Sequence, residues 1–135
     1  MATLSLRPGS FCFARAGGGE ETRLGASLKV LGETLIVRLD GELDLHSAAA
    51  FREAVTAAFQ ERQRLKNLVL LMHDVTFIDS SGVGAILGRL KEVSARGGRL
   101  AVVGLQLPVQ RVFAMSGVLK LISVHDSEGQ ALAGL

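Results

Sequence analysis

The sequence predicts an α/β fold, a single domain in which helices pack against a mixed, mostly parallel β-sheet. Short apolar runs typical of strands alternate with longer segments whose apolar residues recur every three to four positions, as in amphipathic helices. Repeated strand-helix-strand units require parallel neighbours joined by right-handed crossovers. The length of 135 residues suffices to bury a core without a disulfide, and the only cysteine, Cys12, has no second thiol to pair with.

Five stretches have the composition of strands. The first two are joined through Gly32-Glu33, which suits a hairpin turn. The third is apolar at every position and too short for a helix, so we predict a central strand that is covered on both faces. The predicted strands are residues 27–31, 35–39, 68–72, 100–103 and 121–124.

Four helices are predicted from apolar periodicity and from their end signals. Ser47 begins the first, and the polar cluster 79–82 begins the second. Pro108 suits the first turn of the third, and Ser127 and Gln130 have capping-box spacing for a short last helix. The second and third predicted helices are each followed by glycine, at Gly97-Gly98 and Gly117. Glycine at this position favours a left-handed C-cap. In the second helix we expect Val83, Ile86, Leu87, Leu90 and Val93 to point inward, and Arg89, Lys91, Glu92 and Arg96 to point outward.

Residues 1–25 are predicted to be a disordered N-terminal extension, and residues 26–135 the folded domain. The extension contains Arg7-Pro8-Gly9, the glycine run 17–19 and Glu20-Glu21, without a sustained apolar period. A start codon assigned too early would produce the same pattern, so both interpretations stay open.

Charge and hydropathy argue against nucleic-acid and membrane partners. The formal net charge is only +2, the charges are interspersed, and the chain has no Trp or Tyr to stack on bases. Its apolar runs are far shorter than the about 20 residues that span a bilayer. Arg7-Pro8-Gly9 interrupts the one stretch that could act as a signal peptide. We therefore expect a cytoplasmic protein that binds neither nucleic acid nor membrane.

The polar cluster Asp79-Ser80-Ser81-Gly82 is the first candidate functional site. It follows the apolar segment 75–78 and opens the second predicted helix, at the carboxyl edge of the sheet where α/β proteins bind ligands. By composition the cluster is first of all a helix N-cap. The same geometry presents the Ser80 hydroxyl at the positive end of the helix dipole, which can hold a phosphate. Phosphorylation would add roughly 1.5 to 2 negative charges beside Asp79 and repel a partner packed over the loop.

A second acidic turn, Gly41-Glu42-Leu43-Asp44, follows the second predicted strand. Its carboxylates suit solvated loop charges or counter-charges to the next helix. If the two turns are neighbours, Asp44 instead joins Asp79 and Ser80 in one polar patch. Gly82 would allow close approach of another backbone there, or simply supply freedom of φ.

Sequence patterns for enzymes are weak or absent. Gly82, Gly84 and Gly88 resemble a dinucleotide loop, but the third glycine comes one residue late and no acid follows about 20 residues further on. A hydrolase elbow requires glycine two residues before Ser80, where Ile78 stands. The three histidines lack metal-ligand spacing. We therefore predict no enzyme, no cofactor and no metal site.

Three segments carry a resemblance to a known family. They are Gly41-Glu42-Leu43-Asp44, the stretch 77–89 around Asp79-Ser80-Ser81-Gly82, and Phe113-Ala114-Met115-Ser116-Gly117-Val118. In order and spacing they resemble the anti-sigma factor antagonists of the STAS domain family, most closely the sporulation type that acts on the anti-sigma-F factor. The likeness covers the chain from about residue 27 to its end. The extension of about 25 residues has no counterpart in short family members.

The resemblance implies a partner switch controlled by phosphorylation. In that family the first serine after the aspartate, here Ser80, is phosphorylated by the anti-sigma factor, which is an ATP-dependent serine kinase. The unphosphorylated antagonist binds the anti-sigma factor and frees the sigma factor. The phosphorylated form lets go until a PP2C-type phosphatase restores it. Asp44, Asp79, Ser81 and Gly82 are then expected at the partner-binding surface, with Ser81 beside the acceptor and not itself phosphorylated.

Two other functions fit the same residues. A STAS module can serve a general stress response or act as an accessory in a transport system. A small nucleotide-binding protein could use the edge at Asp79 and Ser80, although no base, metal set or phosphate loop accompanies the serine.

Overall fold

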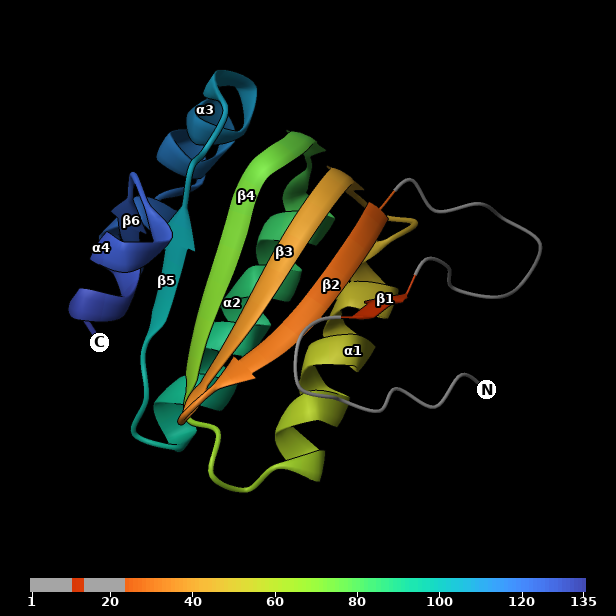
Figure 1. Cartoon of the computed structure of the whole chain (residues 1–135). Helices are drawn as coiled ribbons and strands as arrows, with labels where there is room; N and C mark the ends of the chain where they lie inside the picture. The colour runs from red at the N-terminus through yellow and green to blue at the C-terminus, as the bar shows by residue number, and fades with distance from the viewer. Residues whose placement is uncertain (1–10, 14–23) are drawn as a thin grey trace.

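The computed structural model describes residues 11–13 and 24–135, which form one sheet with helices on both faces (Figure 1). The strands are β1 (Phe11–Phe13), β2 (Leu24–Leu31), β3 (Thr34–Leu43), β4 (Asn67–Ile78), β5 (Leu100–Val103) and β6 (Ser123–His125). The helices are α1 (Ala48–Glu61), α2 (Ser80–Ala95), α3 (Leu107–Ser116), the 3-10 helix η1 (Val118–Lys120) and α4 (Glu128–Ala133). The α/β class predicted from the sequence is confirmed.

The strands of the described residues lie in the sheet in their chain order, from β1 to β6. β2 pairs antiparallel with both β1 and β3, whereas the pairs β3–β4, β4–β5 and β5–β6 are parallel. Each parallel pair is joined by a helical crossover through α1, α2 or α3, as the strand-helix-strand order requires. The sheet is therefore mixed and mostly parallel, as predicted.

Two apolar layers of unequal size cover the sheet. On one face α1, α2 and α3 pack onto the larger core, whose bulkiest fully buried side chains are Phe51, Phe59 and Phe113. On the other face α4 adds Ala131 to a smaller cluster that includes Val69. Full burial of a large apolar side chain stabilises a fold by roughly 1.5–3 kcal/mol, so the three-helix face contributes the larger share of the apolar stabilisation. None of the helices in the described part of the chain is long and apolar enough to cross a membrane.

The helix ends follow the signals in the sequence. Gly97 and Gly117 come after α2 and α3 with φ values of 75° and 79°, the left-handed geometry of a C-cap. Pro108 occupies the first turn of α3. The Ser127 hydroxyl accepts the backbone N–H of Gln130 at 3.2 Å at the start of α4. These predictions are confirmed because each depends only on residues within one or two turns of chain.

Two strand boundaries differ from the prediction. The central strand 68–72 and the apolar segment 75–78 form one strand, β4, because β3 stays paired with it as far as Ile78 through two register shifts. The last strand is residues 123–125 and not 121–124, because η1 and the turn that follows it extend to Ile122. Neither the pairing of β4 with β3 nor the extent of η1 and its turn can be read from local apolarity.

The N-terminal region contains two strand segments where disorder was expected. β2 begins at Leu24, because its pairing with β3 continues to the pair Leu24–Gly41. Residues 11–13 form β1, which pairs antiparallel with residues 26–28 of β2. The remainder of the predicted extension, residues 1–10 and 14–23, lies outside the described residues.

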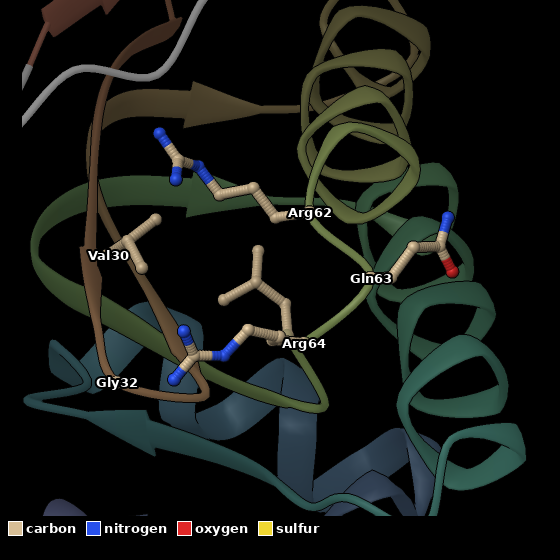
Figure 2. Close-up of a pocket in the computed structure, with 6 residues that line it drawn as sticks. Val30, Gly32, Arg62, Gln63 and Arg64 are labelled. Carbon is tan, nitrogen blue, oxygen red and sulfur yellow. The ribbon is translucent and has the colours of Figure 1, made fainter.

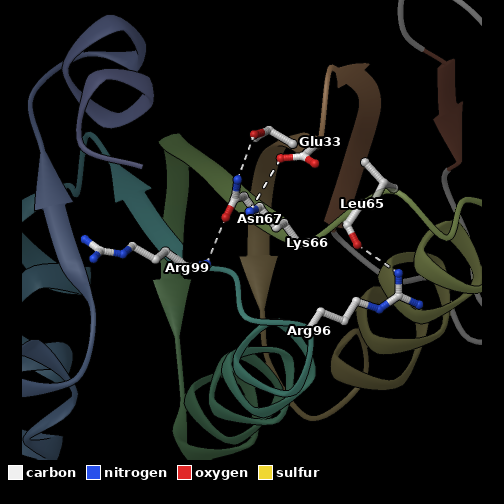
Figure 3. A network of polar contacts seen from close by, with 7 residues as sticks. Glu33, Leu65, Lys66, Asn67, Arg96 and Arg99 are labelled. Carbon is white, nitrogen blue, oxygen red and sulfur yellow. Dashed lines mark hydrogen bonds and ion pairs between the residues drawn. The ribbon is translucent and has the colours of Figure 1, made fainter.

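Arg96 holds the end of α1 from the neighbouring helix α2 (Figure 3). It was predicted to point outward, but it is half-buried, and its guanidinium donates to the carbonyls of Phe59 and Leu65, both at 2.8 Å. Its Cζ also lies 5.0 Å from the centre of the Phe59 ring. The Phe59 carbonyl is among the last of α1, which lack intrahelical partners, and the Leu65 carbonyl lies in the segment after the helix. Arg96 thus satisfies groups that would otherwise need water. The outward prediction was wrong because periodicity locates only the face toward the sheet.

Asn67 ties together the chain segments at the amino ends of the parallel strands (Figure 3). Its side-chain amide donates to Thr34 Oγ1 at 3.4 Å, and its side-chain oxygen accepts the Arg99 N–H at 2.9 Å. Lys66 forms an exposed ion pair with Glu33 at 3.5 Å, a contact that contributes little to stability. These contacts hold the end of the sheet that lies opposite the polar turns.

Replacing Arg96 with alanine should lower the free energy of unfolding by about 2–3 kcal/mol, because charged hydrogen bonds to the carbonyls of Phe59 and Leu65 are lost. Urea denaturation followed by circular dichroism measures this. Arg96→Lys serves as the control and should recover part of the loss, since an ammonium keeps the charge but not the fork of donors. An alanine variant within about 0.5 kcal/mol of the wild type would show that the contact is not stabilising.

Candidate functional site

The candidate site lies at the carboxyl ends of β3 and β4, which are neighbouring parallel strands. The register pairs Leu43 with Ile78, the last residues of these strands, so the turns that follow them lie side by side. Asp44 follows β3, and Asp79 follows β4. The sequence left open whether these two turns are neighbours, and the structure brings them together.

Gly41 shapes the end of β3 that leads into the site. Its φ of 98° lies in the left-handed region that favours glycine, and the register with β4 shifts between Gly41 and Glu42. A bulge of this kind turns the following residues in a new direction. Leu43 is then fully buried in the core, while Asp44 is half-buried at its edge.

The Asp79 carboxylate connects the two turns. Asp79 is the N-cap of α2, and its Oδ1 accepts the backbone N–H of Gly82 at 3.0 Å. Its Oδ2 accepts the backbone N–H of Leu45 at 3.1 Å, across from the β3–α1 turn. The N-cap interpretation of this residue is therefore confirmed. A contact to a distant turn was not foreseeable from a cap pattern.

The Asp44 and Ser47 side chains stabilise the β3–α1 turn through hydrogen bonds to its backbone. Asp44 Oδ1 accepts the backbone N–H groups of His46 at 3.0 Å and Ser47 at 3.2 Å. The Ser47 side chain is fully buried and donates to the Glu42 carbonyl at 2.8 Å, and it accepts the Asp44 N–H at 2.9 Å. Ser47 precedes α1 as predicted, but its hydroxyl bonds back into the turn and not into the helix. The Asp44 carboxylate thus has a structural task as well as a charge.

Ser80 and Ser81 are the first two residues of α2 and differ in exposure. Ser80 is exposed, whereas Ser81 is half-buried. Both stand at the amino end of a 16-residue helix, where unpaired N–H groups and the helix dipole favour negative charge. Ser80, an exposed residue, thus comes directly after Asp79, with Asp44 on the neighbouring turn.

Gly82 is buried, and its lack of a side chain serves contact within the chain. A Cβ at this position would overlap the Leu43 carbonyl oxygen and come within 2.7 Å of Ile78 Cγ1. The sequence left open close approach of another backbone or freedom of φ at this glycine; its φ is not positive, and the backbone that approaches is that of β3. Gly82 therefore positions the amino end of α2 against the sheet.

Two apolar side chains near the polar turns were not singled out by sequence reasoning. Leu45 is 69% exposed in the β3–α1 turn, and Phe77 is 48% exposed at the end of β4. The available signal for Leu45 was a large apolar residue within a polar turn, outside any periodic pattern. Phe77 follows an exposed Thr76, so the alternation of β4 breaks at the register shift. Exposed apolar residues around polar groups are typical of a protein-binding surface.

Arg89 is a further residue whose environment differs from the prediction. It was expected on the outer face of α2, but it is only 7% exposed. Its Nε lies 2.9 Å from Glu92 Oε1, and Thr56 of α1 donates to Glu92 Oε2 at 2.7 Å. Burial lowers the pKa of the Arg89 guanidinium; Glu92 opposes this shift, and nearby Arg52 adds to it. The prediction was wrong because this side of α2 faces α1.

The histidines form no common site in the described residues. His73 is exposed on β4, and Gln106 donates to its backbone carbonyl at 2.7 Å. His125 lies 3.0 Å from Ser123 Oγ in β6. Across residues 24–135, no group of three His, Cys, Asp or Glu side chains has a metal-binding arrangement.

A separate pocket of about 490 Å³ lies at the opposite end of the sheet from Ser80 (Figure 2). The β2–β3 hairpin and the segment after α1 form it, with Val30 and Leu65 as its apolar side chains. Figure 2 shows the Arg62 and Arg64 side chains extending toward the hairpin, while Gln63 points away from it. This pocket includes none of the candidate site residues that were predicted from the sequence.

Comparison with known proteins agrees with this fold. The sequence matches the STAS domain family over residues 26–131, and the chain belongs to that family. It is similar to the anti-sigma F factor antagonist of Paenibacillus polymyxa, with 44% identity over 101 residues that cover 75% of this chain and 86% of the relative.

Two solved structures of relatives resemble the fold. One is the anti-sigma factor antagonist SpoIIAA in its unphosphorylated form, with 32% identity, a TM-score of 0.70, and coverage of 79% of this chain and 92% of that one. The other is the Bacillus cell fate determinant SpoIIAA in the phosphorylated form, with 31% identity, a TM-score of 0.64, and coverage of 80% and 96%. Anti-sigma factor antagonists are regulatory binding proteins, so this chain is a regulatory binding protein and not an enzyme.

Replacing Gly82 with alanine should lower the free energy of unfolding by about 1–3 kcal/mol, because the new methyl group overlaps the backbone of β3. The matched control is Gly84→Ala in the same helix, where a Cβ meets no atom within 4 Å. This control should be neutral or stabilising by up to about 1 kcal/mol, since alanine is the better helix former. Equal stability of the two variants in urea denaturation would refute the close-packing role of Gly82.

Proposed function

We propose that this protein is a phosphorylation-controlled anti-sigma factor antagonist. The unphosphorylated form binds an anti-sigma factor that is also a serine kinase, and this binding releases the sigma factor. Phosphorylation of Ser80 then ends the interaction. The observation that carries the proposal is the exposed position of Ser80 at the amino end of α2, directly after the capping Asp79.

Charge supports a switch that acts on binding and not on folding. A phosphate would add roughly 1.5 to 2 negative charges beside two existing carboxylates. The carboxylates of Asp79 and Asp44 already bond to backbone N–H groups of their own turns, and an exposed Ser80 leaves those bonds in place. The added charge therefore changes mainly what the surface presents. A partner docked over Leu45 and Phe77 would be repelled by the phosphate.

Relatives support the same interpretation. The P. polymyxa relative is an anti-sigma F factor antagonist, and SpoIIAA has structures in both phosphorylation states. Both structures resemble this chain in fold, which fits a modification that leaves the fold intact. Exposure also favours Ser80 over the half-buried Ser81 as the acceptor. Asp44, Asp79 and Ser81 then belong to the partner-binding surface, and buried Gly82 supports it from beneath.

The proposal includes two partners and a cellular setting. The anti-sigma factor acts as the kinase with ATP, and a PP2C-type phosphatase removes the phosphate from Ser80. Because ATP-dependent phosphorylation and sigma factors act in the cytoplasm, the proposed switch is cytoplasmic. The relatives of the SpoIIAA type support a role in sporulation.

Incubation with the anti-sigma F factor of P. polymyxa and Mg-ATP, followed by peptide mass mapping, tests the acceptor. Phosphate is expected on Ser80 in the wild type and in Ser81→Ala, and on neither serine in Ser80→Ala. Phosphate on Ser81 or on another residue would contradict the assignment.

Binding measurements test the electrostatic part of the switch. Ser80→Asp should raise the Kd for the same anti-sigma factor by about tenfold or more, because like charges at an interface are costly. Ser80→Ala is the matched control and should bind as the wild type does. If Ser80→Asp also binds with wild-type affinity, added charge is not what separates the partners.

A further inference from the structure

The sides of α1 and α2 that lie next to the candidate site form a groove of about 550 Å³. We call it the α1–α2 groove and define it by Ala49 and Arg52 of α1 together with Ser81, Gly84, Gly88 and Arg89 of α2. It begins at Ser81, beside the proposed phosphate acceptor, and continues along α2. The groove is therefore continuous with the proposed binding surface.

Neither the backbone conformation nor the packing within the described part of the chain requires glycine at Gly84 and Gly88. Neither has a positive φ, and a Cβ at either position would meet no atom within 4 Å. Glycine is a poor helix former, so two of them inside α2 weaken the helix without improving its packing. They are four residues apart and so share one face of α2. Their absent side chains leave room for another backbone to approach closely.

Arg89 supplies the observation that identifies a ligand. It is only 7% exposed, and its Nη1 is buried without a hydrogen-bond partner among residues 24–135. The Nε contact with Glu92 Oε1 at 2.9 Å is an ion pair without hydrogen-bond geometry, and it leaves Nη1 without an acceptor among the described residues. Arg89 lines the groove, and a buried guanidinium nitrogen without an acceptor is costly, so an acceptor that reached it from the groove would be bound favourably. Arg52 adds a second positive charge at the same groove.

We propose that the α1–α2 groove receives a helix of the anti-sigma factor that inserts an Asp or Glu side chain between Arg52 and Arg89. The inference rests on the proposed function and names the chemistry of the docking element. The small residues admit the helix, and the arginines bind its carboxylate. An acidic element also gives the phosphate its effect, because Ser80 lies only about 12 Å from Gly88 along α2, at 1.5 Å per residue. A phosphate there repels the element that the arginines attract.

Two variants test the groove against the anti-sigma F factor of P. polymyxa by isothermal titration calorimetry. Gly88→Gln fills the groove and Arg89→Gln removes its buried charge; each should raise the Kd at least tenfold. The matched control is Gly129→Gln, which adds the same side chain at an exposed position of α4, and its Kd should stay within twofold of the wild type. Thermal unfolding of Gly88→Gln should be unchanged or occur at a higher temperature, since no atom obstructs the new side chain.

Ionic strength provides an independent measurement. Arg52 is exposed, so Arg52→Gln should lower the association rate and flatten its dependence on salt. Wild-type binding together with unchanged affinity in Gly88→Gln and Arg89→Gln would overturn the groove inference and leave the proposed function intact. Failure of the wild type itself to bind would overturn both. Loss of affinity in the folded Gly88→Gln variant with an unaffected Gly129→Gln control would support the inference.

Discussion

The Asp79 carboxylate bridges two turns that are more than thirty residues apart in the chain, and the candidate site depends on that bridge. One oxygen caps α2 at Gly82, and the other binds the N–H of Leu45. Each bond satisfies a backbone donor that the secondary structure leaves unpaired. Ser80, the next residue, is therefore held at a defined distance from the β3–α1 turn. A single side chain thus converts two separate loops into one surface.

The packing beneath this bridge fixes the positions of the two turns, as the proposed switch requires. Gly82 lets the amino end of α2 approach the Leu43 carbonyl. The register shift after Gly41 changes the direction of β3 just before Leu43. The acidic groups of both turns are bonded to backbone amides before any modification occurs. In the proposed switch, a change of charge on exposed Ser80 would leave these contacts intact and alter the potential that a partner meets.

Sequence reasoning succeeded where the cause is local and failed where it is a contact between helices. The class of fold, the helix starts at Ser47 and Asp79, and the glycine stops follow from period and capping chemistry within a few residues. Arg89 and Arg96 were both predicted to point outward, because the apolar period of α2 reports only the face toward the sheet. In the folded protein Arg89 is buried on the side of α2 that faces α1, and Arg96 reaches the carbonyls of Phe59 in α1 and of Leu65 after it. Charged residues of this kind bury their stems while their heads find partners.

The sequence by itself determined the α/β order of elements, the position of Ser80 directly after an N-cap, and the likeness to the STAS family. Each of these is a property of neighbouring residues or of their order along the chain. Only the tertiary structure decided that the Asp44 and Asp79 turns meet, that Gly82 faces β3, and that a groove lies between α1 and α2. The reason is physical: strand register and helix packing bring together groups that are distant in the chain, and no local pattern encodes those distances.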